Sequence, residues 1–410
     1  MIFLTIYLFL LYKSIIFEIN KRKKTMFIII SIITFILAFN YQMGIDWTNY
    51  QKIYDLKISD FELKDIIFNN SFREEKGYLV LNILGNKLGL NYEVFMGILL
   101  SFCIVTLLNL GKKYSRNIFL FIGVILGKYL LAASLEPTIR QLLAVSIIAL
   151  GYKYIERKSL INYLFCVILA MQFHSSAIIG IGIYFLDKIN ITIKKSIFII
   201  LIFPIILKIL PEVLEIVSSF IPTIGRFNNY FNNIRYGIGF SRNLLGNISR
   251  LGIMFLYLYF IFFSDMKNQK KYIKNTAIFY IIISYFSNQL PILYRVQEYF
   301  IFSFAISLSY VGSTTIFDKK IKICKKEIGL VFVCLIYIII IRGTFQTFYG
   351  SEVNREKYGR YKNYFIELVL GKTSKNFREK SLEYEKKIKS IILDQNKQKE
   401  INLRNNSSIK

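Results

Sequence analysis

Hydrophobic residues occur along this chain in long uncharged runs, which short basic clusters separate. A run of about 17–25 apolar residues can cross ~30 Å of hydrocarbon as a helix. Runs that can form such spans lie at residues 2–17, 25–41, 92–110, 118–133, 138–155, 159–173, 175–187, 196–211, 250–264, 275–290, 297–313 and 328–342. The pattern therefore predicts an all-α fold, a polytopic transmembrane helical bundle with about twelve spans.

The composition agrees with a membrane protein and excludes several other classes. Of the 410 residues, 54% are hydrophobic and 19% are charged, whereas a soluble domain has about 25% charged residues. A soluble enzyme, a secreted disulfide scaffold and a disordered chain are therefore excluded. The four cysteines are scattered and the single histidine cannot build a zinc site, so we expect no metal and no cofactor.

The positions of the charges predict how the chain is oriented in the membrane. Six connections together hold 22 Lys or Arg in 53 residues, and these are 18–24, 111–117, 153–158, 187–195, 265–274 and 314–327. The alternate connections hold 9 in 84 residues, and these are 42–76, 134–137, 211–249 and 291–296. Lys and Arg are enriched in cytoplasmic loops, so the first set is cytoplasmic and the second extracytoplasmic. The net charge of +27 thus reflects orientation, and we expect no nucleic-acid partner.

Two parts of the chain depart from this regular alternation. Residues 77–90 are too short and too polar for a lipid-facing span, which favours a re-entrant or interfacial helix. Residues 343–410 form a charged tail after the membrane domain of residues 1–342, with 15 Lys or Arg against 8 Asp or Glu. The number of spans predicts that this tail lies outside, whereas its charge favours the cytoplasm, so its side stays open. Its Asn- and Lys-rich end is typical of a disordered segment.

Two large extracytoplasmic loops stand out, because the other connections are short. Loop 42–76 is acidic and aromatic, whereas loop 211–249 carries arginines among glycines and asparagines. Long loops on a rigid scaffold are usual places for binding and catalysis. They are either solvated loops with interfacial tyrosines or a sugar-binding platform that faces a phosphate-binding surface. The candidate binding residues in these two loops are Asp46, Trp47, Tyr50, Arg226 and Arg242.

Polar residues within or beside the apolar segments are functional candidates, because an ionised side chain near the bilayer centre costs at least ~2.5–3.5 kcal/mol. Arg140 opens a span four residues after Glu136. The two can pair with each other, or the guanidinium can bind phosphate oxygens. His174 interrupts an apolar stretch at the outer face, either as a hydrogen-bonded structural residue or as an acid, base or ligand. Arg295 and Glu298 flank the outer start of another span and could also pair.

Four short motifs follow one another along the first half of the chain. They are GIDWTNY at 44–50, EKGY at 75–78, TIRQLLA at 138–144 and AMQFHSSA at 170–177. In this order and at this spacing they resemble the EpsG family, bacterial membrane proteins similar to the Wzy polymerases of exopolysaccharide, capsule and O-antigen assembly. The long charged tail is not expected of that family.

The resemblance implies a polysaccharide polymerase at the outer face of the bacterial cytoplasmic membrane. Its substrates would be undecaprenyl-diphosphate-linked oligosaccharide repeat units, and the growing chain would leave its lipid diphosphate to join a new unit. A positive site must stabilise the charge that develops on the leaving diphosphate. A base must lie within hydrogen-bond reach of the acceptor hydroxyl. The implied partners, besides the lipid bilayer, are a flippase and a chain-length regulator of the same pathway.

The resemblance also suggests roles for particular residues. The catalytic candidates are Glu75, His174 and Arg140. Arg140 fits the diphosphate, and Glu75 and His174 rank above Asp46 as the base. The expected substrate-binding residues combine aromatic faces for sugar rings with polar and positive groups, and they are Asp46, Trp47, Tyr50, Tyr78, Gln141, Arg226, Arg242 and Arg295.

Three other functions compete with this interpretation. A membrane O-acyltransferase also uses a membrane-embedded histidine, but it should carry a partner carboxylate or asparagine near His174 and a route for a cytoplasmic acyl donor. A flippase or transporter of the lipid-linked oligosaccharide should show two related halves with broken helices in matching positions, and only one broken stretch is obvious. A structural membrane subunit of a polysaccharide assembly complex is the third alternative.

Overall fold

Helices account for nearly all of the chain that the structure describes. The computed structural model describes residues 2–16, 23–57, 64, 66, 74–136, 138–220, 244–263, 269–287, 290, 292–311, 322–351, 354–355, 358, 361–373 and 390. Within these residues there is no strand, and a single isolated bridge joins Asn40 to Asn363. The predicted all-α fold is therefore confirmed.

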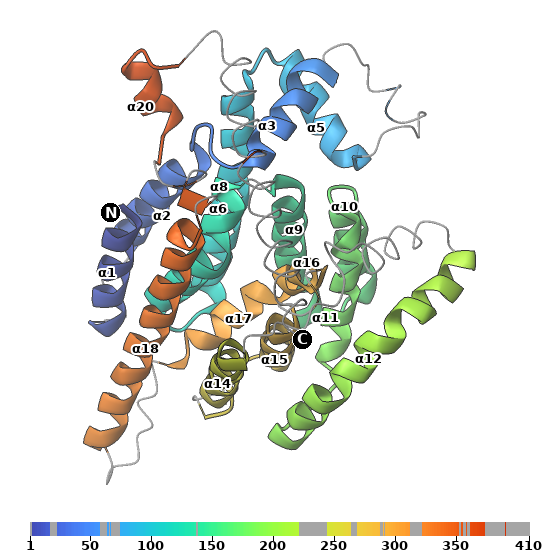
Figure 1. The fold of residues 1–410 in the computed structure, drawn as a ribbon, viewed down its shortest axis with the longest axis vertical. Coiled ribbons are helices and arrows are strands. Elements are labelled where there is room, and N and C mark those ends of the chain that lie inside the picture. The colour runs from blue at the N-terminus through green and yellow to red at the C-terminus, as the bar shows by residue number, and fades with distance from the viewer. Residues whose placement is uncertain are drawn as a thin grey trace, which may run out of the picture.

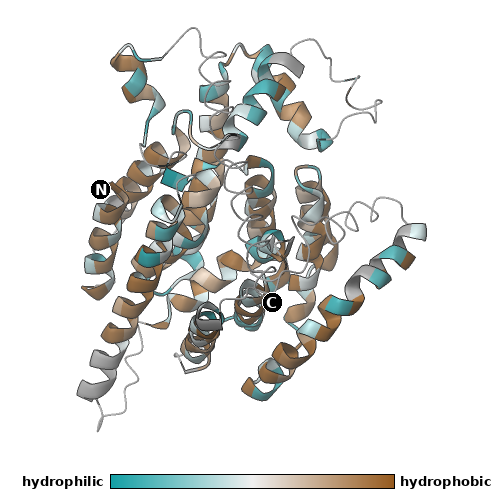
Figure 2. Cartoon of the chain, viewed as in Figure 1, coloured by the Kyte–Doolittle hydropathy of each residue, from teal (hydrophilic) through white to brown (hydrophobic). Residues whose placement is uncertain are grey.

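Apolar helices form a bundle, and most of their residues are hydrophobic, drawn in brown (Figures 1 and 2). Each segment predicted as a span overlaps one or more of these helices. The helices are α1 (Ile2–Ile15), α2 (Lys23–Ala38), α6 (Tyr92–Tyr114), α7 (Ile118–Ile125), η2 (Leu126–Leu130), α8 (Leu131–Leu135), α9 (Ile139–Glu156), α10 (Leu160–Met171), η3 (Ser175–Gly180), α11 (Ile181–Leu186), α12 (Ile193–Phe220), α14 (Leu244–Phe263), α15 (Lys271–Phe286), α16 (Ile292–Gln297), η6 (Glu298–Phe300), α17 (Ile301–Leu308) and α18 (Lys322–Tyr349).

Three stretches of the described chain are both long enough and apolar enough to cross a membrane. They are Tyr92–Tyr114, Ile118–Leu135 and Gly329–Tyr349. Other apolar helices are shorter; α10, for example, has 12 residues and a length of ~18 Å at 1.5 Å per residue, against ~30 Å of hydrocarbon. The prediction of about twelve spans is therefore not confirmed, although the chain is an apolar, helical membrane protein.

The connections between helices lie at the two ends of the bundle, where helix ends contact one another. At one end, Lys113 pairs with Glu156 at 3.3 Å, and the Asn117 amide donates to the Ser309 carbonyl at 3.1 Å. These residues belong to, or adjoin, the connections that the charge pattern predicts to be cytoplasmic. We call this the basic end, and its composition agrees with the predicted alternation of loops.

The opposite end of the bundle, which we call the cap end, is covered by short helices. α3 (Ile45–Lys52), the π-helical turn η1 (Ile53–Lys57) and α5 (Lys76–Lys87) lie beyond the ends of the bundle helices (Figure 1). The helix predicted near 77–90 is therefore present as α5. It buries the side of the helix that carries Tyr78, Leu79, Asn82 and Ile83, as an amphipathic helix does.

Helices extend into both segments that were predicted as large extracytoplasmic loops. Segment 42–76 is not wholly a loop, because α3 and η1 occupy Ile45–Lys57. Trp47, Tyr50 and Tyr54 recur every three or four residues there and form one buried face. The second loop, predicted over 211–249, is shorter at both ends, because α12 continues to Phe220 and α14 begins at Leu244.

The beginning of the tail belongs to the cap end. α18 continues to Tyr349, past the predicted domain boundary at 342. The chain then returns, and the amide of Tyr364 donates to the Phe39 carbonyl at 2.8 Å while the amide of Tyr41 donates to the Lys362 carbonyl at 3.0 Å. These bonds place α20 (Tyr364–Val369) beside the end of α2. Most of the segment predicted to be disordered lies outside the described residues.

Candidate functional site

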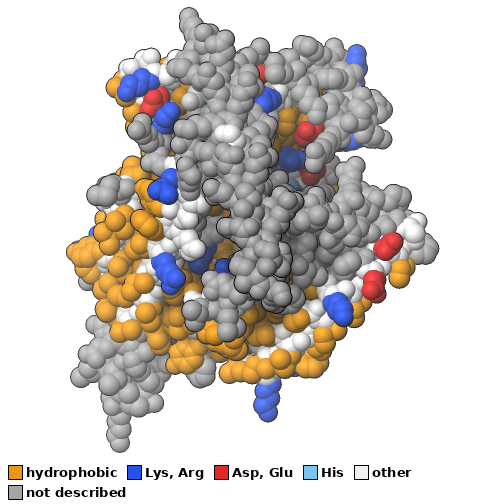
Figure 3. Space-filling view, viewed as in Figure 1, with side chains coloured by type: hydrophobic (Ala, Val, Ile, Leu, Met, Phe, Trp, Pro, Cys, Tyr) orange, Lys and Arg blue, Asp and Glu red, His pale blue; other side chains and the backbone are white. Residues whose placement is uncertain are grey.

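Charged side chains gather where the cap meets the bundle. Figure 3 shows acidic and basic groups there beside the pale blue of the only histidine of the chain. Four elements contribute: α3, the N-terminus of α5, the first turn of α9 and the turn between α10 and η3. We call the cluster of Tyr50, Glu75, Arg140 and His174 the junction site.

The backbone around Glu75 brings the cap close to the bundle. Glu75 is the extended residue just before α5, with φ −67° and ψ 139°. Two residues further on, the backbone amide of Gly77 donates to the Gln172 carbonyl at 2.9 Å. A Cβ atom at Gly77 would lie 2.6 Å from that same carbonyl oxygen, so only glycine permits this approach without a shift of the backbone. The EKGY motif therefore fixes Glu75 over the α10–η3 turn.

Arg140 and Glu75 form the central ion pair of the junction site. The Arg140 Nη1 lies 2.5 Å from the Glu75 Oε2, and these side chains are 26% and 19% exposed. The Arg140 Nε donates to the Tyr50 hydroxyl at 3.2 Å, and the guanidinium lies 5.7 Å from the centre of the Tyr50 ring. The other Glu75 oxygen accepts from the Ser175 amide at 3.2 Å. Glu75 thus connects α5, α9 and the start of η3.

Arg140 does not pair with Glu136, although that pair was one of the two alternatives that the sequence offered. Arg140 pairs with Glu75 instead. Glu136 accepts a hydrogen bond from the hydroxyl of Tyr358, a residue of the tail. Glu136 precedes α9 with φ −114° and ψ 85°, so it is not on the helical surface where residues four apart are neighbours.

His174 takes part in a hydrogen-bonded chain that the sequence alone does not reveal. Its Nδ1 lies 2.6 Å from the Ser176 Oγ, which in turn lies 3.0 Å from the hydroxyl of the buried Tyr299. Burial lowers the pKa of His174 to about 4; Arg140 and Arg295 act in the same direction and Glu75 opposes them. The imidazole is therefore neutral at pH 7, and its low pKa makes it a weaker base than an ordinary histidine.

Two aromatic side chains that were expected to stack on sugar rings are packed inside the protein. Trp47 is 2% exposed and contacts the edges of Tyr41 and Tyr92, with ring centres 6.0 and 4.9 Å away. Tyr78 is fully buried against Tyr50, at 5.5 Å between ring centres. Neither ring offers an open face in this structure, where both pack inside the cap.

Other candidate residues lie at the edge of the junction site or cannot be placed. The Gln141 Nε2 donates to the Arg295 carbonyl at 2.7 Å, which joins α16 to the start of α9. Burial raises the pKa of Tyr50; the positive charge of Arg140 lowers this pKa, and the negative charge of Asp46 raises it further. The Asp46 carboxylate is therefore close enough to influence the junction site electrostatically.

Arg226 and Arg242 lie outside the described residues. Among the residues that are described, no three His, Cys, Asp or Glu side chains lie together as metal ligands.

The fold and the site together define an all-helical membrane protein with a charged site between its bundle and a helical cap. The sequence model of the EpsG family matches residues 23–351, which is most of the chain. The protein therefore belongs to the EpsG family. No curated protein and no solved structure matches it. The family match ends before α20, so the returning part of the tail lies beyond it.

Proposed function

We propose that this protein is a polysaccharide polymerase of the glycosyltransferase type. It joins undecaprenyl-diphosphate-linked oligosaccharide repeat units at the outer face of the cytoplasmic membrane, during the synthesis of exopolysaccharide, capsule or O-antigen. Membership of the EpsG family supports the proposal. The observation that carries it is the meeting of a guanidinium, a carboxylate and a neutral imidazole at the junction site.

The reaction makes one bond and breaks one. The acceptor hydroxyl oxygen bonds to the anomeric carbon of the growing chain, and the bond from that carbon to the diphosphate oxygen breaks. A base takes the hydroxyl proton, and undecaprenyl diphosphate leaves. The Arg140 guanidinium offers a fork of N–H donors that matches phosphate oxygens, and it stabilises the charge that develops on them.

The Glu75–Arg140 pair links donor binding to the availability of a base. Arg140 is already paired in this structure, so phosphate oxygens that bind it compete with Glu75 for its N–H donors. The displaced carboxylate is then free to take the acceptor proton, a role that His174 could also fill.

The test is complementation of a bacterial strain that lacks its own polysaccharide polymerase. The variants are Arg140→Ala, Glu75→Gln and His174→Ala, and the readout is the length of the surface polymer, with the membrane level of each variant measured alongside. We expect single repeat units from the variants and long chains from the wild type. Glu156→Gln is the matched control, because it breaks the 3.3 Å pair with Lys113 at the basic end.

Each outcome separates the proposal from its alternatives. Full-length polymer from all three variants at normal membrane levels would overturn the site assignment. Lipid-linked units that accumulate on the cytoplasmic side of the deletion strain would identify a flippase. Polymer of normal length that lacks acyl groups would identify an O-acyltransferase.

A further inference from the structure

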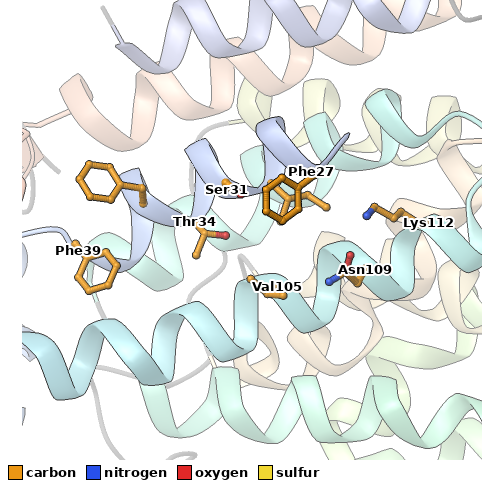
Figure 4. A pocket seen from close by; sticks show the side chains of 9 residues that line it. Phe27, Ser31, Thr34, Phe39, Val105, Asn109 and Lys112 are labelled. Carbon is orange, nitrogen blue, oxygen red and sulfur yellow. The ribbon is translucent and has the colours of Figure 1, made fainter. Parts of the chain in front are cut away.

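A groove runs between α2 and α6 on the outside of the bundle, away from the junction site. It has a volume of about 320 Å³. Figure 4 shows its two walls, with Ser31 and Thr34 on α2 facing Val105 and Asn109 on α6. Its lining is mostly aromatic and aliphatic, and it consists of Phe27, Ile30, Ser31, Thr34, Phe35, Phe39, Val105, Asn109 and Lys112. Such a lining suits a hydrocarbon chain.

The two ends of the groove differ. Phe35 and Phe39 form an aromatic cluster with Phe365 of α20 at the cap end, with ring centres 4.8–6.0 Å apart. Lys112 lies at the other end, beside Phe27 (Figure 4). Lys112 is exposed, and no described residue pairs with its ammonium group. A chain in this groove therefore meets aromatic rings at the cap end and a positive charge at the basic end.

We propose that the α2–α6 groove binds an anionic phospholipid of the cytoplasmic leaflet, with one acyl chain between the helices and its phosphate on Lys112. The charge at this end favours a negative headgroup, because the basic segments 18–24 and 111–117 adjoin the start of α2 and the end of α6. The side of the membrane follows from the orientation that those segments predict.

The length of the groove fits a lipid of one leaflet. From Phe27 to Phe39 there are 12 residue steps, or ~18 Å at 1.5 Å per residue, which is close to half of the ~30 Å hydrocarbon core.

The test measures lipid binding to the purified full-length protein by native mass spectrometry. The probes are phosphatidylglycerol and phosphatidylcholine with identical acyl chains. We expect the wild type to prefer phosphatidylglycerol and Lys112→Gln to bind it about five-fold more weakly, from ~1 kcal/mol per basic residue near an anionic surface. Val105→Trp, which fills the groove, should lose one bound phosphatidylglycerol.

Lys113→Gln is the matched control, because Lys113 is the next residue but pairs with Glu156. It should bind phosphatidylglycerol as the wild type does. Equal binding of the two lipids by the wild type, or equal losses in the two lysine variants, would overturn the headgroup assignment. An unchanged number of lipids on Val105→Trp would overturn the groove. Displacement of phosphatidylglycerol by an equimolar polyprenyl phosphate would overturn the choice of occupant. None of these results depends on polymerase activity.

Discussion

Replacement of Glu75 by glutamine should loosen the cap without loosening the bundle. Glutamine keeps an oxygen that can accept from the Ser175 amide, but it removes the charge that Arg140 contacts at 2.5 Å. A hydrogen bond to a charged group contributes about 1.5–3 kcal/mol. Because both side chains are less than one-third exposed, most of this value should apply. At 1.36 kcal/mol per factor of ten, open forms of the cap should become about 10- to 150-fold more populated.

Hydrogen exchange measures this change directly. The Gly77 amide is protected by its 2.9 Å bond to the Gln172 carbonyl, so it exchanges only when α5 leaves the α10–η3 turn. Peptides that cover 75–87 should therefore exchange about 10- to 150-fold faster in Glu75→Gln, while peptides from the middle of α9 should not change. Glu156→Gln breaks a pair whose lysine is 54% exposed and should leave α5 unchanged, as expected of a surface ion pair.

Two results would refute this reasoning. Unchanged exchange in peptides 75–87 would mean that the ion pair does not hold the cap. Faster exchange throughout α9 as well would mean that the substitution loosens the bundle as a whole. In the second case, a loss of polymer in the complementation assay would reflect stability, and it would say nothing about the chemistry of Glu75.

Three further predictions concern the surroundings of the junction site. Gly77→Ala should abolish long polymer and speed exchange in α5, because its Cβ would lie 2.6 Å from a backbone carbonyl oxygen, whereas Gly182→Ala, with open space around it, should do neither. Tyr358→Phe removes the donor to Glu136 and should lower the unfolding midpoint in detergent by about 1–2 °C, since a hydrogen bond contributes about 1 kcal/mol. The pKa of His174 is about 4 in the fold against 6.5 ordinarily, so the unfolded chain takes up its proton first as the pH falls. Stability should therefore decrease between pH 6.5 and 4, by up to about 3 kcal/mol, and His174→Gln should flatten that part of a plot of unfolding midpoint against pH.

The helices were predictable because apolar runs have no other way to satisfy their backbone in a membrane. Two features, α3 and the number of spans, do not follow from this argument. α3 has a polar average composition, and only the spacing of Trp47, Tyr50 and Tyr54 reveals its buried face. The number of spans is not confirmed, because a hydropathy pattern does not fix helix length: the apolar run at 159–173 contains α10, which has 12 residues.

The site was predictable only in part, for a related reason. Arg140, His174 and Glu75 stand out as polar groups beside apolar segments. Their arrangement does not follow from local spacing, because Glu75 and Arg140 are 65 residues apart in the chain. The nearer carboxylate, Glu136, suggested a local pair, but it lies outside the helix. A single sequence carries no signal for such a distant partner.

The way in which the cap is held bears on how a lipid-linked substrate could enter. Arg140 belongs to the bundle, whereas its partner Glu75 belongs to the cap. The same guanidinium that would bind a diphosphate under the proposed function therefore also keeps the cap closed. A substrate phosphate that displaces Glu75 from Arg140 removes a charged hydrogen bond that contributes about 1.5–3 kcal/mol. The backbone hydrogen bond from Gly77 to Gln172 remains. Donor binding would thus loosen the cap without detaching it, and it would leave a carboxylate at the edge of the opening, where an acceptor hydroxyl must arrive.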